Sequence, residues 1–125
     1  MEDKNPPRDD GATPLFIAAK NGHLEICKLL VDNVENKNPA KNDGFTALHV
    51  SAAAGYLEIY EMIMKNVDDK NPKANCGTTP LHLAAEMGNV EIFKLIINSI
   101  EDLNPMNNQG ETPLFWLLRI ITLKF

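Results

Sequence analysis

The chain has 125 residues, the length of a single domain. Hydrophobic residues make up 44% of it and charged residues 23%, which disfavours a collagenous, disordered or disulfide-built protein. The formal net charge of −5 at pH 7 repels a phosphate backbone and argues against nucleic acid as a partner.

The sequence repeats with a period of 33 residues. Thr13-Pro14-Leu15 recurs as Thr46-Ala47-Leu48, Thr79-Pro80-Leu81 and Thr112-Pro113-Leu114, and glycines and an Asn-Pro pair keep the same period. A fixed period of this length is typical of stacked structural repeats. We therefore divide one domain into the tail of a preceding repeat (1–10), repeat 1 (11–43), repeat 2 (44–76), repeat 3 (77–109) and a C-terminal half repeat (110–125).

Each repeat predicts two short helices followed by a loop. In repeat 1, Thr13 is expected to cap a helix over about 14–21, and the proline after it suits the first helical position. Gly22 can take the positive φ of a tight turn, and a second helix follows over about 24–33. That helix is apolar around most of its circumference, so it needs neighbours on two sides, which stacked copies supply. The loop over 34–43 predicts an extended turn that reaches away from the helices.

Two segments carry a resemblance to a known family. They are Thr79-Pro80-Leu81-His82-Leu83-Ala84-Ala85 and Gly22-His23-Leu24-Glu25-Ile26. Both resemble the most distinctive segments of the ankyrin repeats, and the likeness covers about residues 3–118. The resemblance implies an all-α solenoid of stacked antiparallel helix pairs with projecting β-hairpin-type fingers. It also implies a non-catalytic module that binds a protein partner, as scaffold or inhibitor, on a concave face made of the fingers and the first helices.

Among the departures from that family pattern is the end of the second helix. Where a glycine is expected after each second helix, the chain has Val34, Val67 and Ile100. Asn33 and Asn66 stand one residue earlier, and asparagine tolerates the left-handed conformation better than most residues. We therefore expect these two asparagines to end the second helices in that conformation.

The residues with reactive side chains favour structural roles. His49 and His82 occupy equivalent positions in neighbouring repeats, too far apart to share a metal ion, and the resemblance implies a local hydrogen bond for each. Cys27 falls on the apolar side of its helix and is expected to be a buried, inert thiol. Cys76 lies in a finger, where exposure leaves a redox or small-molecule role as an alternative. No catalytic triad, phosphate loop, metal site or cofactor site is indicated, so we do not expect an enzyme.

Five positions in each repeat have no structural duty in the repeat pattern, and they supply the predicted partner-binding residues. These are Asp9, Asp10, Ala12, Lys20, Asn21, Asn42, Asp43, Phe45, Asn75, Cys76, Thr78, Glu86, Met87, Asn108, Gln109 and Glu111. Phe45 and Met87 amid polar residues suit an interface with an apolar centre and a polar rim. The alternative is a purely structural segment of a longer repeat array, which binds no partner itself.

The C-terminal segment over 113–125 is the most apolar part of the chain. It is too short to span a membrane and includes Arg119 and Lys124, so no membrane association is expected. We expect its inner side to pack on the second helix of repeat 3 and its outer side to stay bare, which favours homo-association through 113–125. The N-terminus does not resemble a signal peptide, and two unpaired cysteines fit a reducing compartment, so an intracellular location in cytoplasm or nucleus is expected.

Overall fold

The computed structural model describes residues 6–123, with residues 120–123 described by their backbone alone. Its helices are α1 (Pro14–Lys20), α2 (Leu24–Asn33), α3 (Ala47–Ala54), α4 (Leu57–Met64), α5 (Pro80–Met87), α6 (Val90–Ile97) and α7 (Pro113–Leu123). No β-strand occurs between residues 6 and 123. The all-α fold expected from the sequence is confirmed, whereas the β-hairpin character of the fingers is not.

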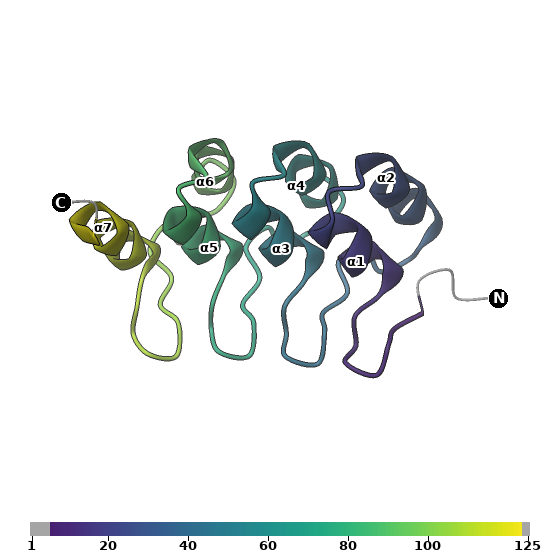
Figure 1. Ribbon diagram of the computed structural model, residues 1–125, viewed down its shortest axis with the longest axis horizontal. Coiled ribbons are helices and arrows are strands. Elements are labelled where there is room, and N and C mark those ends of the chain that lie inside the picture. The colour runs from purple at the N-terminus through teal and green to yellow at the C-terminus, as the bar shows by residue number, and fades with distance from the viewer. Residues whose placement is uncertain (1–5, 124–125) are drawn as a thin grey trace.

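The helices form two rows, and the loops between repeats project from one side of them (Figure 1). The first helices α1, α3, α5 and α7 pack on one another in order, and so do the second helices α2, α4 and α6. The projecting tips are finger 1 (8–12), finger 2 (41–45), finger 3 (74–78) and finger 4 (107–111). In finger 2, the Lys41 N–H donates to the Phe45 carbonyl at 2.8 Å and closes the tip.

The first helices begin as the sequence predicts. The Thr13 hydroxyl accepts the Phe16 N–H at 3.2 Å, and the Thr79 hydroxyl accepts the His82 N–H at 3.3 Å. After α1, Gly22 has a φ of +77°, which confirms the expected tight turn. The ring of Tyr56 from repeat 2 lies so close that a Cβ on Gly22 would be 2.9 Å from it. A side chain at residue 22 would therefore clash with the next repeat as well as strain the backbone.

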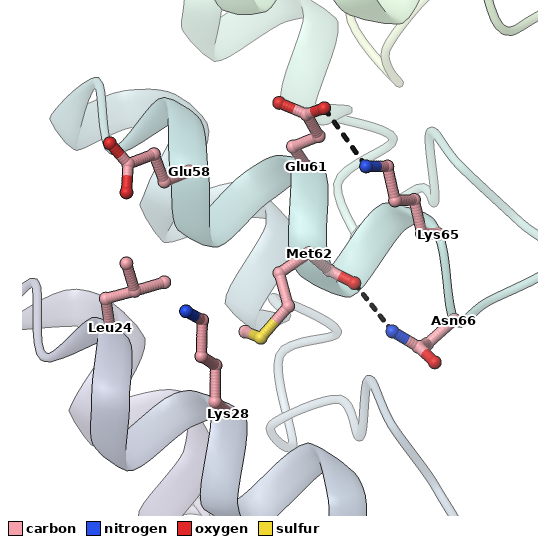
Figure 2. A pocket seen from close by; sticks show the side chains of 7 residues that line it. All are labelled: Leu24, Lys28, Glu58, Glu61, Met62, Lys65 and Asn66. Carbon is pink, nitrogen blue, oxygen red and sulfur yellow. Dashed lines mark hydrogen bonds and ion pairs between the residues drawn. The ribbon is translucent and has the colours of Figure 1, made fainter.

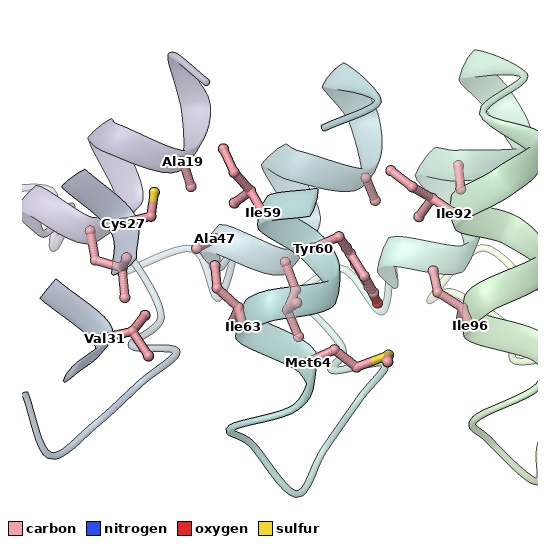
Figure 3. Packing of buried hydrophobic residues seen from close by; sticks show 14 of the residues in the cluster. Ala19, Cys27, Val31, Ala47, Ile59, Tyr60, Ile63, Met64, Ile92 and Ile96 are labelled. Carbon is pink, nitrogen blue, oxygen red and sulfur yellow. The ribbon is translucent and has the colours of Figure 1, made fainter. Parts of the chain in front are cut away.

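The second helices bury both of their sides against neighbouring repeats (Figure 3). On α4, Ile59 and Ile63 point toward α2, while Tyr60 and Met64 point toward α6, and all four are buried. On α2, by contrast, the counterpart of Ile59 is Ile26, which is exposed. No described helix lies on that side of α2. A second helix thus buries each side only where a neighbouring repeat packs against it, as the sequence predicts.

The packing of α7 corrects one expectation. The helix packs against α5, the first helix of repeat 3, and does not seal the second helix α6. The reason is the row arrangement, in which first helices stack on first helices. Residues 120–125, part of the segment expected to mediate homo-association, lie outside the described side chains.

The ends of the second helices correct another expectation. No residue other than glycine has a positive φ in the described part of the chain, so Asn33 and Asn66 do not take the left-handed conformation. Instead, the ammonium group of Lys70 donates to the Met64 carbonyl at 2.9 Å and to the Val67 carbonyl at 2.7 Å. Lys37 makes the same pair of contacts after α2. A lysine thus binds the last carbonyls of the helix and complements the negative end of its dipole.

We predict that Lys70→Leu lowers the free energy of unfolding by about 1–2 kcal/mol, because two charge-assisted hydrogen bonds at a helix end are lost. Repeat 3 naturally has a leucine at this position, Leu103, which is exposed. The reverse change, Leu103→Lys, should therefore stabilise by about 0.5–1 kcal/mol. Urea unfolding of both variants tests the pair, and a Lys70→Leu variant as stable as the natural chain would contradict the capping role.

Candidate partner-binding surface

The fingers are joined to one another by a ladder of asparagines. The Asn42 backbone N–H donates to the Asp10 carbonyl at 3.0 Å, and its side-chain amide donates to the Asp9 carbonyl at 3.0 Å. Asn75 makes the same two bonds to finger 2, at 3.0 and 2.9 Å, and Asn108 makes them to finger 3, at 2.8 and 2.8 Å. We call residues 42, 75 and 108 the ladder positions. Each finger is thereby fixed relative to the finger before it.

The ladder requires glycine in the neighbouring finger. A Cβ on Gly44, which has a φ of +87°, would lie 2.6 Å from the backbone nitrogen of Asn75 and 2.7 Å from its Oδ1. The asparagine side chain therefore rests on the bare glycine of the preceding finger. This close approach explains why glycine and asparagine keep the same period in the sequence.

The ladder corrects part of the predicted binding set. Asn42, Asn75 and Asn108 were expected to have no structural duty, but their amides bind the preceding finger. Ala12 and Thr78 are buried, so their side chains offer no surface to a partner. Phe45 and Glu111 are half-buried. The remaining predicted residues are exposed: Asp9, Asp10, Lys20, Asn21, Asp43, Cys76, Glu86, Met87 and Gln109, together with the outer sides of the three asparagines.

The acidic groups of fingers 1 and 2 are partly neutralised within the fingers. Arg8 lies 2.8 Å from the Asp10 carboxylate, and its hydrogen bond, with that of the Ala12 N–H, lowers the pKa of Asp10 to about 2. Lys41 lies 3.6 Å from the Asp43 carboxylate and 5.2 Å from the centre of the Phe16 ring. Asp9 has no such cation in the described part of the chain. The surface of fingers 1 and 2 is therefore less negative than its number of aspartates suggests.

The two apolar residues of the predicted surface differ in their surroundings. Met87 ends α5 and is 59% exposed. Phe45 packs edge-on against the His49 ring, with 5.0 Å between ring centres, and is half-buried. Met87 therefore offers more apolar surface to a partner than Phe45 does. It lies next to Glu86 at the end of a first helix, where repeat 1 has Lys20 and Asn21.

The buried histidines join consecutive repeats. The Thr46 N–H donates to Nδ1 of His49 at 3.1 Å, so the ring proton resides on Nε2, which donates to the Thr78 carbonyl of finger 3 at 2.9 Å. His82 makes the equivalent bonds to Thr79 and to the Glu111 carbonyl. The local bond implied by the resemblance is present, and a second bond to the following finger accompanies it. Both histidines are structural and hold the fingers against the first helices.

A comparison with protein-family models matches residues 1–75 and 62–119 to ankyrin repeats, in three copies. The chain belongs to the ankyrin-repeat family. Members of this family are generally modules for protein–protein interaction and are typically non-catalytic. A search of curated proteins finds no match to the chain.

The cysteines of this ankyrin-repeat chain lie where the sequence predicts. Cys27 is buried on α2, and burial raises the pKa of its thiol to about 11, which keeps it protonated and unreactive at neutral pH. Cys76 is exposed on finger 3, where its thiol lies 3.2 Å from the Thr78 hydroxyl. Within the described residues, no group of three or more His, Cys, Asp or Glu side chains could bind a metal ion. None of the described helices is long and apolar enough to cross a membrane.

A groove lies between the second helices α2 and α4 (Figure 2). Leu24 and Met62 are its apolar lining, and Lys28, Glu58 and Lys65 are among its charged lining residues. Its polar groups are largely engaged already, because Glu61 pairs with Lys65 at 3.2 Å and the Asn66 amide donates to the Met62 carbonyl at 2.8 Å. The groove therefore offers few free groups that could orient a ligand.

Sequence reasoning missed the structural roles of two sets of recurring residues. The ladder asparagines and the capping lysines, Lys37 and Lys70, both recur with the 33-residue period, which was the available signal. Recurrence showed that these positions matter to the repeat, but it did not show which groups they bind. The asparagines bind the preceding finger, and the lysines bind the end of the second helix of their own repeat. Only the three-dimensional arrangement identifies these partners.

We predict that stability falls as pH is lowered from 6.5 to about 4, in part because of His49. Burial lowers the pKa of His49 to about 4 in the folded chain, opposed by the hydrogen bond to Thr78, whereas the unfolded chain has a pKa near 6.5. Between these two pKa values only the unfolded state binds the proton. The free energy of unfolding therefore falls by about 3 kcal/mol as the pH is lowered across this range. The pKa of His82 is lowered for the same reason, with the same sign.

The test is urea unfolding of the natural chain and of His49→Phe at pH 7 and pH 4. Repeat 1 has Phe16 at this position and buries it, so the substitution fits the fold. The variant should be less stable at pH 7, and the difference in stability should shrink by about 3 kcal/mol at pH 4. Parallel stability curves for the two chains would show that His49 does not titrate as described.

Proposed function

We propose that this ankyrin-repeat chain binds a protein partner on the surface formed by its fingertips and the C-terminal ends of its first helices, as a scaffold or an inhibitor. The observation that carries the proposal is Met87, a large apolar side chain that is 59% exposed at the end of α5. The equivalent end has Lys20 and Asn21 in repeat 1 and the small residues Ala53 and Ala54 in repeat 2. A large flexible apolar contact with polar residues around it is typical of interface centres.

The ladder supports this role by making the surface rigid before binding. Fingers 2, 3 and 4 are each bonded to the finger before them through backbone and side chain. Fingers 3 and 4 are also bonded to a first helix, through His49 and His82. A partner then orders few loops on binding, so little of the interaction energy is lost to conformational entropy. We therefore propose Asp9, Lys20, Asn21, Glu86 and Met87 as the principal contacts.

Other residues of the predicted surface join this group with smaller roles. Asp10, Asp43, Cys76 and Gln109 are exposed on the fingertips, and Phe45 presents only part of its ring. Exposed groups at the edge of an interface contribute less than its apolar centre. A free exposed thiol on Cys76 and a buried one on Cys27 are compatible with a reducing compartment, so we propose cytoplasm or nucleus as the location.

We predict that Met87→Glu weakens capture of the partner at least tenfold, because a charge is placed at the apolar centre of the interface. The measurement uses the immobilised chain as bait in an extract of its source cells, with quantitative mass spectrometry of the bound proteins. Leu29→Glu is the matched control, since Leu29 is exposed on a second helix and the change in charge is the same. A protein that is lost with Leu29→Glu and retained with Met87→Glu would place the site on the second helices instead.

Self-association through α7 is a second candidate function. Leu114 is 55% exposed and Phe115 is 49% exposed, whereas their counterparts in repeat 3, Leu81 and His82, are fully buried. Neighbouring exposed apolar side chains on a helix favour association. We propose that two copies can pair through this side of α7.

We predict that the natural chain forms dimers whose population rises with concentration, and that Phe115→Lys leaves a monomer with an unchanged helical spectrum. Sedimentation velocity over a wide concentration range measures this directly. Leu29→Lys, at the opposite end of the array, should dimerise like the natural chain. A natural chain that stays monomeric at millimolar concentration would exclude the α7 pairing.

A further inference from the structure

The C-terminal ends of the first helices differ in size and charge from repeat to repeat. At equivalent positions, repeat 1 has Lys20-Asn21, repeat 2 has Ala53-Ala54 and repeat 3 has Glu86-Met87. Their helices α1, α3 and α5 pack side by side in that order (Figure 1). Two small side chains therefore lie between two pairs of larger ones, with a cation on one side and a carboxylate on the other. We call Ala53 and Ala54 the alanine site.

Contacts between repeats hold these three helix ends in place. The ring of Tyr56, from the turn after α3, lies against Gly22 in the turn after α1. The amide of Asn89, from the turn after α5, donates to the Ala52 carbonyl at 2.6 Å and to the Ala53 carbonyl at 3.1 Å. Hydrogen bonds and close ring contacts allow little displacement, so the repeats do not close up around the alanine site. The small size of its side chains leaves room for a side chain from outside.

Lys20 and Glu86 are free to pair with a partner. Lys28, Lys65 and Lys94, on or next to the second helices, each form an ion pair with a glutamate of a second helix, at 3.2 to 3.9 Å. Neither Lys20 nor Glu86 forms an ion pair in the described part of the chain. They lie two repeats apart, about 20 Å, beyond the Debye length of about 8 Å at physiological ionic strength. Each can therefore attract an opposite charge at its own side of the alanine site.

The alanine site suits an apolar side chain. Its two methyl groups offer no hydrogen bond, and the carbonyls of Ala52 and Ala53 already accept the Asn89 amide. Met87 ends the neighbouring helix α5 and is 59% exposed. A bulky apolar residue over the alanine site would gain contact with this flexible apolar neighbour, which is how the centres of interfaces are built.

We propose that the protein partner places a bulky apolar side chain over the alanine site, against Met87, and flanks it with an acidic residue facing Lys20 and a basic residue facing Glu86. This arrangement rests on the proposed function and adds the order of residues that the partner must present. Adjacent repeats lie about 10 Å apart, which an extended segment covers in about three residues and a helix in about seven. The partner's acidic, apolar and basic residues should follow one of these two spacings.

The test selects binders from random peptides displayed on phage, with the immobilised chain as bait. Peptides of about 16 residues span three repeats even when they are helical. Those that bind the natural chain should weaken at least tenfold with Met87→Glu, and should share a bulky apolar residue between an acidic and a basic one. Lys20→Glu should select a basic residue on both sides, and Glu86→Lys an acidic residue on both sides, because the partner's charge follows the surface.

Matched variants separate the site from general effects of charge and size. Each charge change uses a residue that another repeat has at the equivalent position, so it fits the fold. Lys28→Glu reverses a charge on a second helix and should leave the selected pattern unchanged. Ala54→Met copies the end of repeat 3 and fills the alanine site, so peptides selected on the natural chain should bind it at least tenfold more weakly.

The outcomes distinguish this arrangement from the proposed function. Peptides that depend on Met87 but keep the same charges with Lys20→Glu and Glu86→Lys would overturn the arrangement and leave the proposed function standing. Peptides that bind Ala54→Met as tightly as the natural chain would do the same. If no selected peptide depends on Met87, the proposed function and the arrangement both fail. Thermal unfolding of each variant confirms that it is folded.

Discussion

No second helix of this chain can bury its own apolar surface, and the whole architecture follows from that constraint. On α4, one side faces the helix before it and the other faces the helix after it, so burial of Ile59 and Tyr60 depends on two different repeats. Where a neighbour is missing, as beside Ile26, the same surface is exposed. Stability in this fold is therefore a property of interfaces between repeats more than of any repeat alone.

Apolar stacking fixes the distance between repeats but not their register, and polar bonds supply the register. His49 joins the cap of its own helix to the next finger, and Asn75 joins two fingertips through both backbone and side chain. Such bonds have narrow geometric tolerance, so a repeat displaced by a fraction of a turn would lose them. The result is a row of loops with little freedom, which is unusual for segments without regular secondary structure.

Most of the fold could be predicted from the sequence because its signals are local. The threonine caps, the turn at Gly22 and the two-sided apolar pattern each reside within one repeat.

The errors concern groups whose hydrogen-bond partners lie in another segment of the chain. Asn33 was expected to end α2 by a change of backbone, but a lysine several residues later binds the free carbonyls. Asn42 was expected to have no structural duty, but its amide binds the previous finger. The candidate surface was predicted as a row of positions, and the structure separates that row into buried, bonded and exposed members, which the sequence pattern does not distinguish.

The leucine at residue 103 implies an uneven resistance to local opening along the array. Repeats 1 and 2 each anchor the end of their second helix with a lysine, whereas α6 has no ammonium group at the equivalent place. The loop after α6 also leads to finger 4, where a Cβ on Gly110 would meet no described atom within 4 Å. Fluctuations that expose backbone amides should therefore begin in residues 98–106 and spread toward the N-terminus, with repeat 2, enclosed on both sides, exchanging its protons last. A partner that covers the last repeat would slow amide-proton exchange over far more of the chain than it contacts, because it would stabilise the segment in which local unfolding begins.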